Sequence, residues 1–194
     1  MKRAIRNILK GIFIFVSRLI IPLFFKRKYL SGKWFEESAA GWLWAWKGIW
    51  WQKIHKFNRH IPWPVSPLIR ISSAANITFH PDDLNNFQGF GNYFQNFSGK
   101  IVVGRGTYIA PNVGIITANH DPLDLDKHLP GKDVVLGEGC WIGMNSVILT
   151  GVILGHHSIV GTGSVVTRSF VEGNCIVAGN LARVIRNLGD SIES

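Results

Sequence analysis

A six-residue period in the second half of the chain restricts the possible folds more than any other feature. Between Val134 and Arg168 an aliphatic side chain recurs at every sixth position without a gap: Leu136, Ile142, Ile148, Leu154, Val160 and Val166. An amphipathic helix would repeat its apolar residues every three to four positions, and a half-buried strand every two. The period of six predicts a parallel β-helix, in which each repeat is one side of a coil and its aliphatic residue points inward.

Small or β-branched residues accompany this period. They follow the aliphatic position directly or by four places: Gly137, Cys140, Gly143, Ser146, Val152, Gly155, Ser158, Gly161 and Ser164. The same period occurs earlier, irregularly at first: Ile71, Ile77, Phe97, Val103, Ile109 and Ile115. Because strands of neighbouring coils pair with one another, the backbone N–H and C=O groups of such a chain find hydrogen-bond partners only when the coils stack.

The period is interrupted once. Leu136 follows Ile115 by 21 positions, which is not a multiple of six, so residues 118–133 must leave the stack as a loop. The polar and titratable residues of this loop are Asn119, His120, Asp121, Asp124, Asp126 and His128. Long loops on a rigid scaffold commonly carry function.

Positive charge is concentrated before the repeats. Most of the net charge of +9 lies outside the repeats, and Lys and Arg are concentrated in the first sixty residues, among them Lys2, Arg3, Arg6, Lys10, Arg18, Lys26, Arg27, Lys28, Lys47, Lys53, Lys56 and Arg59. This asymmetry indicates an anionic partner, either a membrane or a nucleic acid. The two cysteines, Cys140 and Cys175, provide no disulfide or metal framework, and Cys140 is expected to be a buried thiol.

Residues 1–25 have the pattern of a basic amphipathic helix that ends near Pro22. One face is apolar: Ile5, Ile8, Leu9, Ile12, Val16, Leu19, Ile20 and Leu23. The other is polar: Arg3, Arg6, Asn7, Lys10, Ser17 and Arg18. Arg18 interrupts the apolar run before the roughly 20 residues that a span requires, and no signal-peptide cleavage site follows. A helix in the bilayer interface fits best; the alternative is a helix packed on a partner subunit.

Residues 34–63 contain seven of the eight tryptophans: Trp34, Trp42, Trp44, Trp46, Trp50, Trp51 and Trp63. Tryptophan favours the membrane interface because its ring is apolar and its N–H needs a partner. A Trp-rich core and a surface that stacks single-stranded nucleic acid are alternatives, although no nucleic-acid fold signature accompanies them. We expect a membrane-associating appendage over residues 1–65, a β-helix over 66–188 and a tail over 189–194.

One titratable group adjoins the scaffold at the interruption of the repeats. His120 lies between Asn119 and Asp121, and histidine is the natural general base near neutral pH. The alternative is a solvated loop histidine without a role. His156 and His157 fall on outward corner positions and are expected to be plain surface residues.

Four motifs in combination resemble the hexapeptide-repeat acyltransferases: residues 115–121, 140–143, 161–168 and 179–183. The nearest branch is that of the maltose, galactoside, nodulation and polysaccharide O-acetyltransferases, and the resemblance covers about residues 85–188. It implies a left-handed β-helix, a homotrimer, and acetyl-CoA bound between adjacent subunits. No metal is expected, because the sequence has no zinc-ligand spacing. Residues 1–65 do not resemble the N-terminal helices of the soluble sugar acetyltransferases.

The resemblance also implies roles for single residues. His120 matches the catalytic base and Asn96 the acceptor-binding asparagine. The matches to cofactor contacts are Trp141, Met144, Thr162, Thr167, Arg168, Arg183 and Arg186. For the family's acidic acceptor contacts we name only Asp82 and Asp83 as candidates. The usual Gly-Asn-Pro-Ala turn has leucine instead of proline at Leu181.

These observations predict an acetyl-CoA-dependent O-acetyltransferase that acts on a sugar hydroxyl by direct transfer. Together with the basic appendage they indicate a lipid-linked or surface-polysaccharide acceptor and a peripheral position at the cytoplasmic face of the cell membrane. No nucleic-acid partner is expected. An N-acyltransferase for a nucleotide amino sugar and a non-catalytic β-helix scaffold are the alternatives.

Overall fold

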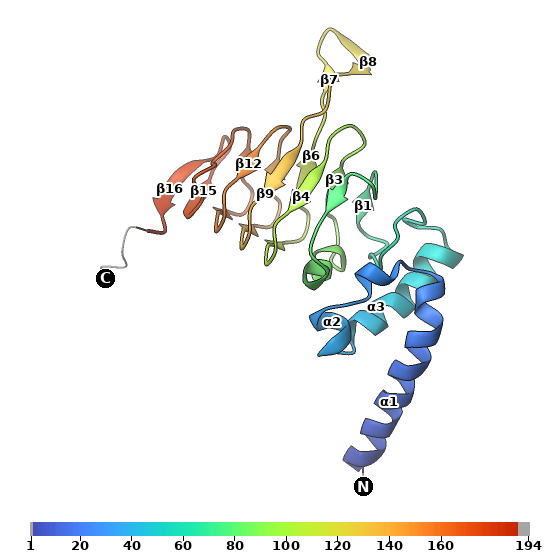
Figure 1. Cartoon of the computed structure of the whole chain (residues 1–194). Helices are drawn as coiled ribbons and strands as arrows, with labels where there is room; N and C mark the ends of the chain where they lie inside the picture. Colours follow the sequence, from blue (N-terminus) through green and yellow to red (C-terminus); the bar gives the residue numbers. More distant parts are fainter. Residues whose placement is uncertain (1, 190–194) are drawn as a thin grey trace.

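The computed structural model describes residues 2–189 and consists of a helical part packed on one end of a β-helix (Figure 1). The tail predicted over 189–194 lies, apart from its first residue, outside the described residues. The helical elements are α1 (Lys2–Ile20), η1 (Ile21–Leu23), η2 (Arg27–Tyr29), α2 (Lys33–Glu36), α3 (Ala40–Gly48), the π-helical η3 (Ile49–Ile54) and, within the first coil, η4 (Pro81–Phe87).

Three sheets form the sides of the β-helix, and the middle coils contribute one strand to each sheet in turn. Sheet A contains β1 (Arg70–Ile71), β3 (Tyr93–Gln95), β6 (Gly114–Ile116), β11 (Val147–Ile148) and β14 (Val165–Val166). Sheet B contains β2 (Ile77–Thr78), β4 (Ile101–Val103), β9 (Val134–Leu136) and β12 (Ile153–Leu154). Sheet C contains β5 (Tyr108–Ile109), β10 (Trp141–Ile142), β13 (Ile159–Val160), β15 (Cys175–Ala178) and β16 (Arg183–Asn187). Within these three sheets the strand pairs are parallel except β15 with β16, which closes the last coil.

The inward column of side chains is the one that the six-residue period predicts. All six aliphatic residues from Leu136 to Val166 are buried. The earlier register contains one error. Phe97 was expected to point inward, but it is 45% exposed, and Phe94 occupies the core position at 1% exposure. The chain between β3 and β4 is longer than a regular corner, so the period slips there.

An aromatic cluster closes the end of the β-helix against the helical part. Trp63, Phe79, Phe87 and Phe94 follow one another with ring centroids 4.5–5.6 Å apart, and Tyr29 joins them from η2. The cluster covers the first coil, whose strands would otherwise have an open end.

The tryptophans of residues 34–63 are mainly structural, so their burial favours the alternative of a Trp-rich core. Trp42 and Trp63 are buried, and Trp34, Trp44 and Trp46 are half-buried against the core. Indole N–H groups donate to protein oxygens: Trp34 to Asp82, Trp42 to Phe35 and Trp46 to Ser17. Of the seven tryptophans in residues 34–63, only Trp50 and Trp51 are more than a third exposed.

A hairpin leaves the β-helix between β6 and β9 and projects from it (Figure 1). It consists of β7 (His120–Asp121) and β8 (Asp124–His128), paired antiparallel in a sheet of their own. It lies in the interruption that the period leaves between Ile115 and Leu136. In the described part of the chain, no helix has both the length and the apolar character to cross a bilayer.

Candidate active site

The root of the hairpin is held by a side chain of the preceding coil. The Gln95 Oε1 atom accepts hydrogen bonds from the backbone N–H groups of Thr117 and Ala118, both at 3.0 Å, and its Nε2 donates to the Ala118 carbonyl at 3.0 Å. Thr150, one coil further on, donates to the Thr117 carbonyl at 2.7 Å. These contacts place the first residue of β7 at a defined position on a rigid scaffold.

His120 is exposed, and one of its two ring nitrogens has a partner. Nδ1 lies 2.7 Å from the Leu125 carbonyl oxygen, across the hairpin. A carbonyl only accepts, so Nδ1 carries the proton in the neutral ring and Nε2 keeps its lone pair. The His128 ring packs against His120 with centroids 4.1 Å apart, and Phe97 meets His128 edge-on at 5.0 Å. This geometry leaves Nε2 able to accept a proton from a hydroxyl.

Two predicted cofactor contacts share the corner from which the hairpin emerges. Thr167 and Arg168 follow β14 where sheet A turns toward sheet B, and both are exposed. The Arg168 guanidinium lies over the Phe170 ring at 5.4 Å. Thr117, Thr150 and Thr167 occupy this corner in three successive coils, each stacked on the one before. Two coil spacings of about 4.8 Å therefore separate Thr167 from the hairpin root.

A second set lies on the outer face of sheet C. The strand register aligns Tyr108, Trp141, Ile159, Ile176 and Arg186 in one row. Tyr108 and Trp141 are 54% and 56% exposed, so they form an apolar surface on the middle coils. Three strand spacings, about 14 Å, lead from Trp141 to Arg186. Arg183 is on the same strand and pairs with Ala178.

The remaining predicted contacts occupy the corner from sheet C to sheet A. Met144 and Thr162 lie in successive coils of this corner, where the Gly163 N–H donates to the Met144 carbonyl at 2.8 Å. The next turn, 179–182, is formed despite Leu181 in place of proline. The Gly179 carbonyl accepts from Val165, and Ala182 donates to the Val165 carbonyl.

The predicted site residues thus fall into two sets on different parts of the prism. His120, Thr167 and Arg168 belong to the corner between sheets A and B. Trp141 and Arg186 lie on the outer face of sheet C, and Met144 and Thr162 on its corner with sheet A. A single chain does not bring the two sets together.

The structure does not support acceptor binding by Asn96. This residue is fully buried, its Oδ1 accepts from the Ser73 N–H at 2.9 Å, and its Nδ2 donates to the Ser73 carbonyl at 2.7 Å. Its amide ties two coils together and is not free for a ligand. Asp82 and Asp83 are also structural, because they accept from the backbone of Lys33 and Gly106 respectively.

Sequence reasoning missed Gln95 and the packing of Phe97 and His128 around His120. Gln95 lies in a strand whose pairing with β6 only the topology reveals. Cys140 is buried as predicted, and burial raises the pKa of its thiol, so it is unsuited to nucleophilic chemistry. Among residues 2–189 no three His, Cys, Asp or Glu side chains are grouped to hold a metal ion.

Residues 133–168, the most regular coils, match the family described as bacterial transferase hexapeptide (six repeats). These coils are therefore similar to the hexapeptide repeats of bacterial transferases. The predicted left-handed parallel β-helix agrees with this match and with solved structures of similar fold, and the predicted helical N-terminal part is present in the structure. Nodulation protein L of Rhizobium meliloti (strain 1021) is 40% identical over 115 residues, which are 55% of this chain and 62% of that protein.

Two solved structures of similar fold are sugar acetyltransferases. A galactoside acetyltransferase in complex with coenzyme A has a TM-score of 0.55 at 30% identity, over 66% of this chain and 62% of that one. A maltose O-acetyltransferase from Clostridium difficile 630 has a TM-score of 0.52 at 30% identity, over 62% and 63%. Relatives from Saccharomyces cerevisiae, Dictyostelium discoideum and Schizosaccharomyces pombe are matched over only 44% to 64% of their own length. The chain therefore spans less than two thirds of those relatives.

Proposed function

We propose that this protein is an acetyl-CoA-dependent O-acetyltransferase whose acceptor is a sugar hydroxyl of a lipid-linked or surface-polysaccharide glycan. The observation that carries the proposal is the hydrogen bond between His120 Nδ1 and the Leu125 carbonyl, which leaves Nε2 as a base. The galactoside and maltose acetyltransferases named above support both the acetyl donor and the class of acceptor.

The reaction follows from this tautomer. His120 Nε2 takes the proton of the acceptor hydroxyl while the oxygen attacks the thioester carbonyl carbon. When the tetrahedral intermediate collapses, the carbon–sulfur bond breaks and the imidazolium returns the proton to the departing thiolate. General base catalysis of this kind contributes about 10²–10⁴-fold, and alignment of two substrates in one cleft contributes as much or more.

The cleft is proposed to lie between two subunits of a homotrimer. The two sets of site residues are on separate parts of one chain, so a neighbouring copy is needed to join them. The hairpin tip has apolar residues that one chain leaves bare, since Leu123 is 95% and Leu125 70% exposed. Such side chains suit a subunit contact.

Attachment to an anionic membrane surface through α1 is the second part of the proposal. The helix turns Phe13 and Ser17 toward α3, where Trp46 donates to Ser17. A stripe of other apolar residues points away from the protein, each more than a third exposed: Ile5, Ile8, Leu9, Ile12, Phe15, Val16 and Leu19. An apolar stripe beside Arg and Lys is typical of helices in the bilayer interface.

Acetyl transfer tests the catalytic part. We expect His120→Ala to lower kcat by about 10²–10⁴-fold while the trimer and the affinity for acetyl-CoA persist. His156→Ala, which also removes an exposed imidazole from a coil corner, is the matched control and is expected to keep full activity. Near wild-type turnover by His120→Ala would refute the assignment. A panel of sugar hydroxyl and amino sugar acceptors separates O- from N-transfer, and no turnover with any of them would favour a scaffold.

Flotation with anionic liposomes tests the attachment. Replacing Ile8 and Ile12 by Ser removes the centre of the apolar stripe, and the variant is expected to remain in the aqueous fraction. The control variant replaces Asn7 and Gly11 by Ser. These residues come one position before Ile8 and Ile12, toward the polar side of the helix, and the control is expected to float. Equal flotation of both variants would contradict attachment through this face and favour a helix packed on a partner.

A further inference from the structure

A groove beside the C-terminal end of α1 is lined almost entirely by basic and apolar groups. It has a volume of about 400 Å³ and runs between the segment 22–27 and the segment 59–62. Its walls are joined by a hydrogen bond from the Lys26 N–H to the Pro62 carbonyl at 2.9 Å. The cationic residues that line it are Lys26, Arg27, Lys53 and Arg59, and His60 lies beside them.

These four cations have no counter-charge in the described structure. No Asp or Glu is among the described residues that line the groove, and none of the ion pairs within residues 2–189 involves them. Lys53 is half-buried, with its Nζ 4.8 Å from the centroid of Phe25 and 3.4 Å from the Arg59 carbonyl. Burial, and then the charge of Arg59, lowers the pKa of Lys53. A cluster of like charges of this kind is destabilising unless an anion neutralises it.

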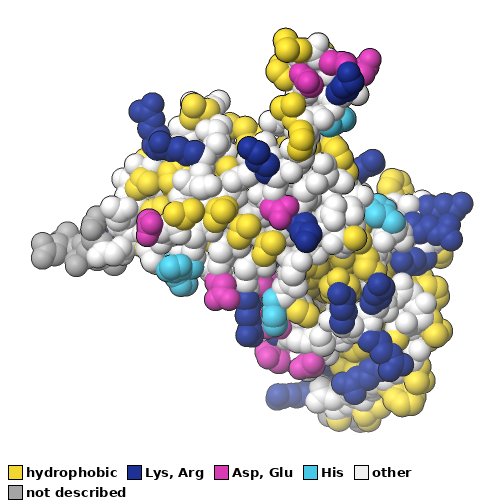
Figure 2. All heavy atoms as spheres, turned by 45° about the horizontal axis from the view of Figure 1, so that its top comes forward, with side chains coloured by type: hydrophobic (Ala, Val, Ile, Leu, Met, Phe, Trp, Pro, Cys, Tyr) yellow, Lys and Arg dark blue, Asp and Glu magenta, His cyan; other side chains and the backbone are white. Residues whose placement is uncertain are grey.

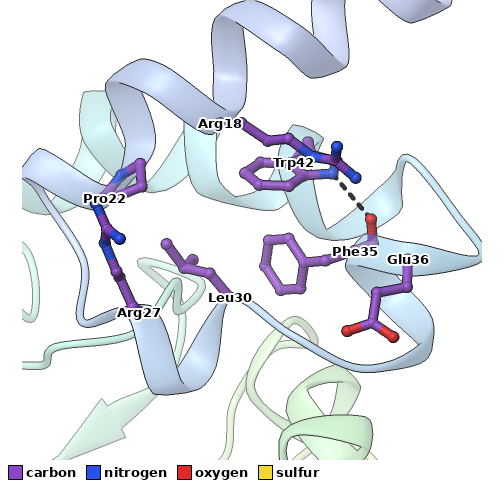
Figure 3. Close-up of a pocket in the computed structure, with 7 residues that line it drawn as sticks. All are labelled: Arg18, Pro22, Arg27, Leu30, Phe35, Glu36 and Trp42. Carbon is purple, nitrogen blue, oxygen red and sulfur yellow. Dashed lines mark hydrogen bonds between the residues drawn. The ribbon is translucent and has the colours of Figure 1, made fainter.

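The neighbouring hollow shows what the groove lacks. It is lined by Arg18, Arg27, Leu30, Phe35 and Glu36, among others, and Figure 3 shows these side chains around it. Glu36 contributes a carboxylate there, which disfavours a second anion. Arg27 lines both hollows, but the positive groove has no carboxylate. It is therefore the better anion site on this side of the protein.

The groove is continuous with apolar surface that lacks a partner. Leu23 and Phe24 line it and are 79% and 40% exposed. They come at the end of η1, the short helix that follows α1, and the exposed apolar stripe of α1 ends at Leu19. In the space-filling view, basic and apolar side chains alternate over the helical part of the molecule (Figure 2). Phosphate next to hydrocarbon is the chemistry of a lipid headgroup and its acyl chains.

We propose that this groove binds the anionic phosphate of a membrane lipid, with Lys53 and Arg59 as its main ligands and with Leu23 and Phe24 in the acyl region. Ammonium and guanidinium groups bind phosphate oxygens by charge-assisted hydrogen bonds. The inference rests on the membrane attachment proposed above and is independent of the transfer chemistry. A lipid phosphate carried by the glycan acceptor would place that acceptor near the subunit that modifies it.

The test compares vesicle binding of the full chain and of two variants with equal loss of charge. Lys53→Gln with Arg59→Gln removes two groove cations. Lys47→Gln with Arg70→Gln removes one exposed Lys and one exposed Arg outside it. Vesicles of phosphatidylcholine contain either phosphatidic acid or, at equal surface charge, phosphatidylserine. A second groove variant, Lys26→Gln with Arg27→Gln, serves if the first does not fold by circular dichroism.

We expect wild type and the control to prefer phosphatidic acid, and the groove variant to bind those vesicles about tenfold more weakly and to lose the preference. Acetylation of a soluble acceptor remains at the wild-type level in the groove variant. Repeating the binding in the His120→Ala background separates this site from the proposed catalysis, because binding there is unchanged even if the assigned chemistry is wrong.

Three outcomes would overturn the proposal. Equal losses in the groove and control variants mean diffuse charge attraction. Binding of inorganic phosphate that depends on Lys53 and Arg59 but without any preference among vesicles means a site for a soluble anion. Binding of a single-stranded oligonucleotide with the same dependence, and none to vesicles, means a nucleic-acid surface.

Discussion

Asp82 links three parts of the molecule through one side chain and one carbonyl. Its Oδ1 accepts from the Lys33 N–H at 2.9 Å, its Oδ2 from Arg105 at 3.0 Å, and its carbonyl from the Trp34 indole at 2.7 Å. The Lys33 N–H, and then Arg105 and His80, lower the pKa of the Asp82 carboxyl. The charged form of this residue therefore helps to hold α2 on the β-helix.

Replacing Asp82 by Asn is expected to destabilise the protein near neutral pH. Because the folded-state pKa is depressed, the contribution is fully present above the unfolded value of about 3.9 and is lost as pH falls through the lower folded-state value. The side chain is partly solvated, so we expect about 1 kcal/mol at pH 7. Urea unfolding at pH 7 and at pH 3 or below measures it, and the difference from wild type should shrink in acid. A pH-independent difference would contradict this account, and Asp126→Asn on the hairpin is the control.

Single residues also mark how far the sequence predicts the candidate site. His120 is predictable as a candidate because the lost register isolates one loop with a titratable cluster. Asn96 was misassigned as an acceptor contact, because a local motif does not reveal that its side-chain amide is hydrogen-bonded to the backbone of Ser73. Gln95 was missed because its bonds to Thr117 and Ala118 cross 22 and 23 positions of sequence, a pairing that only the coil length establishes.

The hairpin depends on its root more than on its own strands. Replacing Gln95 by Leu leaves the Thr117 and Ala118 N–H groups without this acceptor, and the position of His120 becomes less defined. We expect kcat to fall by about tenfold to a hundredfold with little change in KM for acetyl-CoA, because the base is displaced and the cofactor surface is not. Steady-state kinetics together with amide exchange of residues 117–129 measures both effects.

Gln88 provides the matched control for this element. Its Nε2 donates to the Pro64 carbonyl at 2.7 Å and to the Leu84 carbonyl at 3.3 Å, near the helical part. Gln88→Leu is expected to cost comparable stability while kcat is retained. A similar fall in kcat in both variants would mean that the effect of Gln95 is general destabilisation.

The strands could be predicted from the sequence where one position of the repeat determines which side chain is buried. The coils from Leu136 to Val166 follow from their sequence because each inward residue faces the same position of the next coil. The register failed at Phe97, where extra residues lengthen a corner. In the helical part the tryptophans pack on one another and on Phe35 and Asp82, contacts without a period. The sequence predicts that α1 has an apolar face, but it does not predict what that face binds.

Across the whole molecule, the outer faces of the prism bear on the proposed homotrimer. Sheet B has an apolar outer row of Val102, Val135 and Ile153, and Ile153 is 41% exposed. The hairpin leaves the corner at one edge of this sheet, and the row of Trp141 lies on another sheet. A threefold arrangement of copies closes such faces around an axis and gives three equivalent clefts.

Mixing two inactive variants tests whether each cleft takes His120 from one subunit and Trp141 from the next. His120→Ala and Trp141→Ala chains are each expected to have little activity as homotrimers. After denaturation and refolding of an equal mixture, a cleft is intact when a Trp141→Ala chain supplies the base and a His120→Ala chain supplies the indole. Random assembly makes about a quarter of the clefts intact, so the mixture should recover about a quarter of wild-type kcat. If both residues acted within one chain, every cleft would lack one of them, and the refolded mixture would show only the mean activity of its two parents.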